Sequence, residues 1–257
     1  MNIPAVFWHN LFGMDLGKNV GASAPAGATP SVALQDERGR SRRPRTLYFL
    51  FLAFCFCLPV RAQEVVTFSL DFPGSEPSHY AISVSSDGHS TYDSDGKLSP
   101  DADGDPFHLD FSMSTETKGR VFDLAKSAHY FDGQVDSKRK NLASTGVKIL
   151  TYKDSTRSTS ATYNYSPVVA VQQITQLFQN LSMTLEYGRR LEYFHHYQKL
   201  ALDDELKRME DGAQRGDMEE ITAVVPILQR IASDPSVINP VRARAQRMIA
   251  RAGTPKR

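Results

Sequence analysis

Apolar and polar residues alternate through much of the first half of the chain that follows residue 62. Apolar side chains occupy every second position in three runs, 66–72, 80–84 and 107–113. Because successive side chains of a strand point to opposite faces, each run predicts a strand with one buried face. Asp87-Gly88 lies between the second run and Thr91-Tyr92, and such a turn, in which Asp and Gly tolerate positive φ, predicts a hairpin.

The same region contains a helical pattern and a second hairpin. Apolar residues spaced by three and four after Ser114-Thr115 predict a helix; they are Val121, Leu124, Ala125 and Ala128. The runs 148–152 and 159–165 predict a hairpin rich in Thr and Ser, with one solvated face. We therefore expect an α+β domain over 63–181, an antiparallel sheet of hairpins with helices on one face.

The periodicity becomes helical after residue 165. Ser166-Pro167 predicts a helix start, a hydroxyl N-cap followed by Pro at the first helical position. The helical pattern continues from Leu181 to Met209, and its apolar stripe includes Tyr197. Residues 182–257 are therefore expected to form a C-terminal helical segment.

A helix pair is expected at 217–252. The first helix has an apolar face from Met218 to Ile231 with a kink at Pro226, and Asn239-Pro240 opens the second. Residues 226–245 with their flanks resemble a single degenerate HEAT-type repeat. Because one pair cannot form a solenoid, we expect it to dock on the long helix before it.

The strongest targeting signal is the apolar run from Leu47 to Leu58, which follows five arginines and precedes Pro59-Val60-Arg61-Ala62. A run of about twelve apolar residues is shorter than the roughly 20 that a membrane span needs. It predicts a signal peptide at 46–62 with cleavage after Ala62, and export to the periplasm or the extracellular space. A buried core helix or an uncleaved membrane anchor is the alternative. Residues 1–45 are expected to be a disordered leader or to precede the true translation start.

The composition narrows the class of protein. Of 257 residues 40% are hydrophobic, which suffices for a core, and the net charge of +1 argues against a strongly basic nucleic-acid binder. Cleavage after Ala62 would remove both cysteines and turn the net charge to −3. An exported body without disulfides favours a bacterial envelope. The layout of 63–252 also resembles a family of exported bacterial proteins of unknown function, which implies no particular activity.

The acidic stretch 87–110 is the best candidate for a ligand site. Aligned on Gly104, four carboxylates fall near the ligand positions of a calcium-binding loop; they are Asp101, Asp103, Asp105 and Asp110. Ser99 stands where the first Asp belongs, and Pro106 replaces the usual aliphatic residue. The alternative is a hairpin turn with a solvated acidic loop.

A second candidate is Glu192 with His195, whose spacing places both side chains on one helix face. A di-iron site requires two such motifs, and only one is present, so a surface or core role is expected. The sequence contains neither His-Glu-x-x-His nor Gly-x-Ser-x-Gly.

These features favour a non-enzymatic, exported protein-interaction or envelope-associated module that meets a protein partner through its C-terminal helices. No cofactor and no nucleic acid are expected, membrane contact is expected only through an uncleaved signal segment, and the oligomeric state stays open. One alternative is a calcium-binding adhesion protein that uses the 87–110 loop. Another is a hydrolase in which Asp101, Asp103 or His108 lies close to His195.

Overall fold

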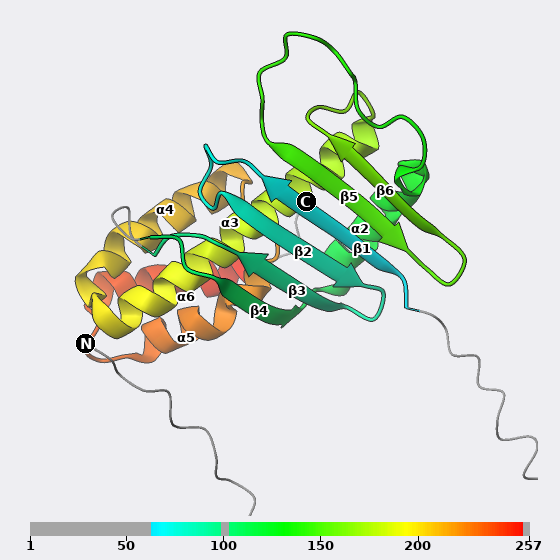
Figure 1. Ribbon diagram of the computed structural model, residues 1–257. Coiled ribbons are helices and arrows are strands. Elements are labelled where there is room, and N and C mark those ends of the chain that lie inside the picture. Colours follow the sequence, from blue (N-terminus) through cyan, green and yellow to red (C-terminus); the bar gives the residue numbers. More distant parts are fainter. Residues whose placement is uncertain (1–62, 99–102, 254–257) are drawn as a thin grey trace, which may run out of the picture. The chain divides into compact units, whose positions relative to one another are not determined.

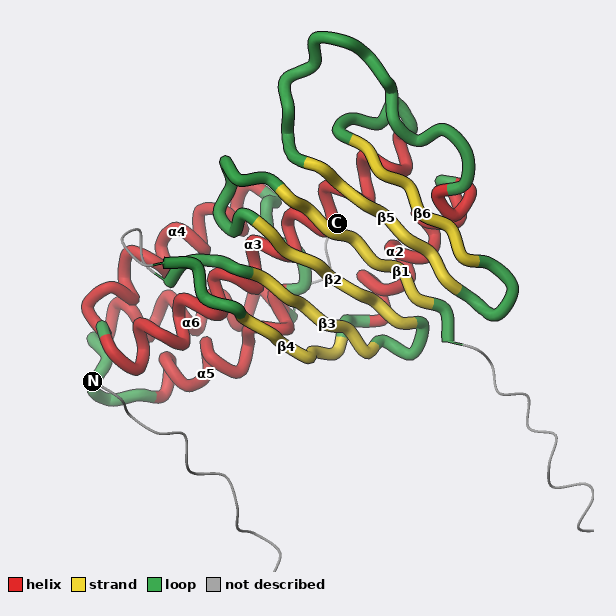
Figure 2. The backbone as a smooth tube through the Cα atoms, viewed as in Figure 1, coloured by secondary structure: helices red, strands yellow, loops and turns green. Residues whose placement is uncertain are grey.

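The computed structural model describes residues 63–98 and 103–253, which belong to one compact unit. The predicted leader at 1–45 and the predicted signal peptide at 46–62 lie outside the described residues. The ribbon and the backbone tube show a sheet backed by helices, with further helices beyond one end of the sheet (Figures 1 and 2).

The sheet has six antiparallel strands in the order β4-β3-β2-β1-β5-β6. Their bounds are β1 Val65–Asp71, β2 His79–Ser85, β3 His89–Ser94, β4 Phe107–Ser112, β5 Val147–Lys153 and β6 Ser158–Tyr163. The strands lie where the alternating runs predicted them. The α+β class with a helical C-terminal segment is confirmed.

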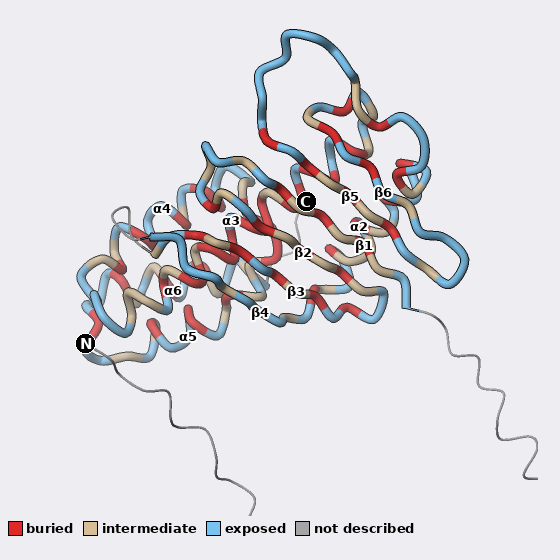
Figure 3. Tube along the Cα trace, in the orientation of Figure 1, coloured by how far each residue is buried: buried red, intermediate tan, exposed pale blue. Residues whose placement is uncertain are grey.

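One face of the sheet is covered and the other is open. On β1, Val66, Phe68 and Leu70 are buried, whereas the residues between them are partly exposed. The same alternation recurs along β2 and β5 (Figure 3). Helices α2 (Thr115–Ser127) and α3 (Val169–Tyr197) pack on the covered face (Figure 1). The open face of the β5–β6 hairpin carries the expected Thr and Ser side chains.

The two helix starts differ in how they are capped. Ser114 is the N-cap of α2, and its Oγ accepts a hydrogen bond from the Thr117 N–H at 3.3 Å. The predicted cap at Ser166 is wrong, because α3 begins only at Val169. The Ser166 hydroxyl instead accepts the N–H of Val168 at 3.2 Å, which closes a turn before the helix.

Helix α3 serves two hydrophobic clusters. Its first half, up to Leu185, packs into the cluster formed with the sheet and α2. From Leu191 onward it packs into a second cluster formed with the C-terminal helices. The expected boundary between residues 181 and 182 therefore lies inside one continuous helix.

The predicted continuous helix through Met209 is wrong. Gln198 leaves the helical conformation with φ −144° and ψ 62°, and the short 3₁₀ turn η3 (Lys199–Ala201) leads into α4 (Leu202–Arg215). Tyr197, which was expected in the buried stripe, is 69% exposed. Apolar spacing of three and four continues on both sides of Gln198, so periodicity alone could not reveal the change of direction.

The last helices form the expected pair. The 3₁₀ turn η4 (Ile221–Val224) precedes α5 (Val225–Ser233), and α6 (Asn239–Ala252) follows. Pro226 stands in the first turn of α5, so the predicted kink is wrong; Pro is favoured there because the first N–H groups of a helix have no partner. Helices α5 and α6 pack on each other, α5 also meets α3, and α6 also meets α4, so the pair docks as expected.

Two further local features of the backbone are a turn with positive φ angles and a close approach at a glycine. The short turn η2 (His129–Phe131) links α2 to the loop before β5 and has three consecutive residues with positive φ. Gly188 lies in α3 where η4 approaches closely. A Cβ atom added at Gly188 would stand 2.5 Å from Cγ1 of Val224.

Candidate functional site

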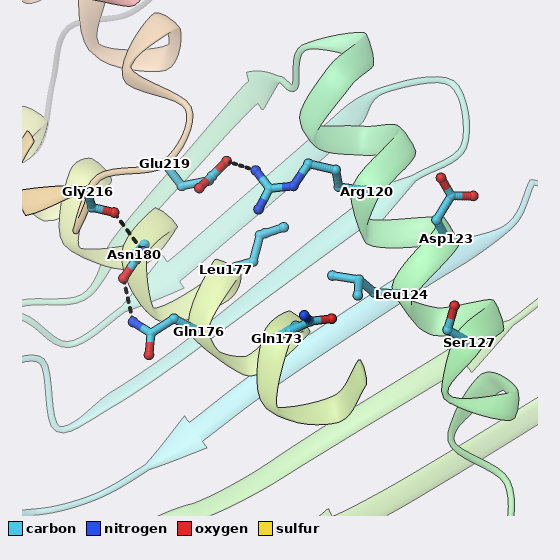
Figure 4. A pocket seen from close by; sticks show the side chains of 10 residues that line it. All are labelled: Arg120, Asp123, Leu124, Ser127, Gln173, Gln176, Leu177, Asn180, Gly216 and Glu219. Atoms are coloured by element: carbon cyan, nitrogen blue, oxygen red, sulfur yellow. Dashed lines mark hydrogen bonds and ion pairs between the residues drawn. The ribbon is translucent and has the colours of Figure 1, made fainter. Parts of the chain in front are cut away.

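A polar cleft lies where α2, α3 and the segment before η4 meet. It has a volume of about 490 Å³. Most of its walls are polar side chains, with Leu124 and Leu177 as the apolar part (Figure 4). Cavities of roughly 300–1,000 Å³ accommodate small ligands. The cleft is therefore the first place to look for a binding site.

The charged groups of the cleft already bind each other. Arg120 on α2 donates to the Glu219 carboxylate at 2.5 Å. Glu219 is buried, and its N–H donates to the Thr184 hydroxyl at 3.1 Å. Asn180 Nδ2 donates to the Gly216 carbonyl at 3.4 Å (Figure 4). These contacts hold the segment before η4 against α2 and α3.

A second hollow of about 840 Å³ shares Gly216 and Glu219 with the first. Its buried carboxylate, Glu220, accepts hydrogen bonds from Ser114 Oγ at 2.8 Å and from Thr222 Oγ1. Ser114 is the N-cap of α2, so this carboxylate also lies near the positive end of the helix dipole. Glu220 has φ 52°, a strained value for a residue with a side chain. Both glutamates thus join α2 and its N-cap to the segment before η4.

Asp234, in the turn between α5 and α6, collects hydrogen bonds from three residues. Lys199 Nζ lies 2.7 Å and His195 Nε2 lies 2.9 Å from its Oδ2. The Ser236 N–H and hydroxyl donate to Oδ1 at 2.8 and 2.6 Å. Lys199 first, and then Ser236, hold the pKa of Asp234 far below its usual range. This network fixes η3 against the α5–α6 turn.

Large apolar side chains stand exposed beside this network. Tyr197 is 69%, Leu200 92% and Ile238 59% exposed. We call these three residues the helical tip. The hydrogen bonds from Lys199 to Asp234 and Ser236 place η3 and the turn that contains Ile238 side by side. Neither the apolar spacing nor any motif of the sequence indicated this surface.

The predicted calcium ligands do not all lie in one loop. Asp101 lies outside the described residues, while Asp103 and Asp105 are exposed. Asp110 lies on the open face of β4. Its Oδ2 is 3.4 Å from Nε2 of His108, and its Oδ1 is 3.5 Å from Nε2 of His89. Within the part of the chain that the structure describes, no group of three or more His, Cys, Asp or Glu side chains is arranged to hold a metal ion.

The acidic loop is anchored by a buried arginine that the sequence did not single out. Arg189 donates to the carbonyls of Gly96 at 3.0 Å and Asp105 at 2.8 Å. Beside it, the buried Glu186 accepts hydrogen bonds from Tyr92 at 2.8 Å and Ser94 at 2.6 Å. Burial raises the pKa of the Tyr92 hydroxyl. This network ties the ends of β3 and of the loop to the middle of α3.

His108 and His195, the two histidines considered as candidate site residues, have different partners. His108 Nδ1 lies 2.6 Å from the Asp93 carboxylate, which raises the pKa of His108. His195 bonds to Asp234, and Glu192 pairs with Arg230 rather than with His195. The described residues therefore do not join Glu192 and His195 into one site.

Two general findings bear on identity. The described part of the chain contains no helix that is both long and apolar enough to cross a membrane. Comparison with protein families, with curated proteins and with solved structures finds no match for this chain.

Proposed function

We propose that this protein is an exported interaction module whose C-terminal helices dock on a protein partner through the helical tip. One observation carries the proposal: Tyr197, Leu200 and Ile238 are largely exposed. The hydrogen bonds of Lys199 hold the segments that carry these side chains next to each other, and contiguous exposed apolar surface commonly marks an interaction site. The proposal that the protein is exported depends on the predicted signal peptide at 46–62.

The tip is suited to binding because its backbone is held in place. The Asp234 network fixes both segments that carry the apolar side chains. A surface that is ordered before binding loses less entropy when a partner arrives. Burying a leucine of this exposure contributes about 1.5–3 kcal/mol, which corresponds to a change in affinity of at least about tenfold.

The polar cleft supports a binding role less well. Its buried carboxylate, Glu219, is already neutralised by Arg120, and its neighbour Glu220 is bonded to Ser114 and Thr222. A ligand that used these groups would have to break contacts that hold α2 and the segment before η4 together. Leu200 and Ile238 can be covered without such a loss.

A photo-crosslinking residue placed at Ile238 in the full chain, expressed in its native cells, tests the proposal. We expect one discrete protein adduct. The substitution Leu200→Ser in the same chain should reduce this adduct at least tenfold, because Leu200 makes much of the contact but little of the fold. A crosslinker at Leu142, which is 42% exposed in the loop before β5, is the matched control and should give no such adduct.

Three results would contradict the proposal. Adducts with lipid alone would assign the tip to a membrane surface. Equal adducts from positions 142 and 238 would indicate unspecific contact. A protein adduct that survives Leu200→Ser unchanged would place the interface elsewhere.

A further inference from the structure

Strand β4 forms one edge of the sheet and, among the described strands, has a neighbour on one side only (Figure 1). The Met113 N–H donates to the Gly88 carbonyl at 3.0 Å, which continues the β3–β4 ladder. Hydrogen-bonded residues of an antiparallel pair alternate, so residues 107, 109 and 111 bond to β3. The backbone groups of His108, Asp110 and Ser112 therefore point away from the sheet.

The two faces of this edge strand differ in chemistry. Phe107, Leu109 and Phe111 lie on the covered side, and all three are only partly buried. His108 and Asp110 lie on the open side and are exposed. Sheet edges attract other strands unless something blocks the approach, and a half-covered apolar row adds to that attraction.

We infer that β4 pairs with β4 of a second copy of this chain, antiparallel and centred on Leu109. A two-fold axis at Leu109 places His108 opposite the second copy's Asp110, and Asp110 opposite the second copy's His108. These are the residues whose backbone groups point outward, so the two pairs form about four backbone hydrogen bonds. An imidazole, positively charged when it is protonated, then faces a carboxylate across the axis at both positions.

The same register also covers the apolar row. Phe107 comes to stand opposite the second copy's Phe111, and Leu109 opposite its own counterpart. Directly opposed side chains have Cβ atoms about 4.5–5.5 Å apart, so these residues pack against each other. Charge complementarity and apolar burial thus select one register, because a shift that pairs Asp110 with its counterpart would oppose two carboxylates.

The other edge strand, β6, lacks these features. Between Ser158 and Tyr163 it carries no charged side chain that could select a register. Its covered-side residues Ala161 and Tyr163 are already buried, so a second copy would gain little apolar contact there. The pairing is therefore assigned to β4.

A charge-exchange experiment on the full chain tests the inference. In Asp110→Lys, position 110 would face the second copy's His108, and in His108→Glu, position 108 would face the second copy's Asp110. Each variant alone should therefore dimerise at least tenfold more weakly than the wild type and be monomeric at concentrations at which the wild type is dimeric. When the two variants are mixed, the introduced lysine of one faces the introduced glutamate of the other, and the remaining His108 faces the remaining Asp110. The mixture should therefore form dimers. Sedimentation velocity measures the mass, and circular dichroism confirms that each variant is folded.

The wild-type chain should be dimeric, and both variants should weaken the dimer at least tenfold. A monomeric wild-type chain at concentrations up to about 100 µM would overturn the inference. Dimers in both single variants would place the interface elsewhere. Monomeric variants whose mixture stays monomeric would show that the charges do not face each other. Ser160→Lys on β6 is the matched control and should leave the dimer intact.

Discussion

The contact between Gly188 of α3 and Val224 of η4 gives a quantitative test of the packing between them. Alanine is a better helix former than glycine by about 1 kcal/mol in a helix interior, so Gly188→Ala would stabilise an isolated α3 by that amount. In the folded chain the added Cβ would stand 2.5 Å from Cγ1 of Val224. Valine cannot swing this atom away, because its branched side chain is stiff and Val224 is buried.

The clash at Gly188 should at least cancel the gain in helix propensity. Forcing an extra carbon into a packed core costs about 1–3 kcal/mol. After the propensity gain of about 1 kcal/mol, the free energy of unfolding should fall by about 0–2 kcal/mol. For a chain of this size each kcal/mol lowers the Tm by about 2–4 °C.

Gly119 provides the matched control. It lies in the interior of α2, and a Cβ atom added there meets nothing within 4 Å. Gly119→Ala should therefore raise the free energy of unfolding by about 0.5–1 kcal/mol. Urea unfolding followed by circular dichroism measures both variants. If Gly188→Ala stabilises the protein as much as Gly119→Ala does, the close approach of η4 to α3 is refuted.

A double-mutant cycle identifies the cause. Val224→Ala alone should cost about 2 kcal/mol, since two buried methyl groups are lost. Combined with Gly188→Ala it should cost less, because the new methyl group occupies the vacated space. A coupling of about 1 kcal/mol or more between the two substitutions is expected, and strict additivity would contradict the reasoning.

Three further results are expected. Glu186→Ala should lower the free energy of unfolding by about 3–5 kcal/mol in urea titrations, since the buried hydroxyls of Tyr92 and Ser94 lose their shared acceptor. It also removes one of the two carboxylates beside the buried Arg189. The same change at the exposed Glu192 should cost less than about 1 kcal/mol, and equal costs would refute the buried network. The pKa of Asp234 is lowered from 3.8 in the folded state, so its stabilising contribution is present at neutral pH and is lost as the pH falls through that lowered value. The stability difference between the wild type and Asp234→Asn in urea should therefore narrow below about pH 4. The pKa of His108 is raised above 6.5 by Asp93, so this contact stabilises the fold at lower pH and is lost as the pH rises through the raised value. An NMR titration should show the raised pKa, and Asp93→Asn should lower it; an unchanged titration in that variant would disprove the assigned cause.

The strands could be predicted from the sequence because each pattern acts locally. Alternation along β1, β2 and β4 and the Asp87-Gly88 turn suffice to define the hairpins. The N-cap of α2 was predicted because a serine precedes an apolar pattern of helical spacing. The errors at Ser166, Gln198 and Pro226 are errors of helix ends, where tertiary contacts decide between similar local conformations.

The candidate sites could not be predicted from local sequence patterns, because their residues come from distant parts of the chain. Arg120 and Glu219 are 99 positions apart, and no periodicity connects them. The helical tip was not predicted because Tyr197 continues the apolar spacing of a buried helix face. The spacing contains no sign that the chain changes direction after Tyr197. Asp110 seemed to belong to an acidic loop, but the alternation of β4 places its side chain on the open face of the sheet.

The continuity of α3 restricts how this protein can be divided during evolution. The helix has 29 residues and spans about 43 Å, with the sheet along its first half and the C-terminal helices along its second. A recombination event that exchanged either half between genes would have to cut a helix whose two halves pack in different hydrophobic clusters. Inheritance should therefore keep the β-sheet and the terminal helices together as one unit.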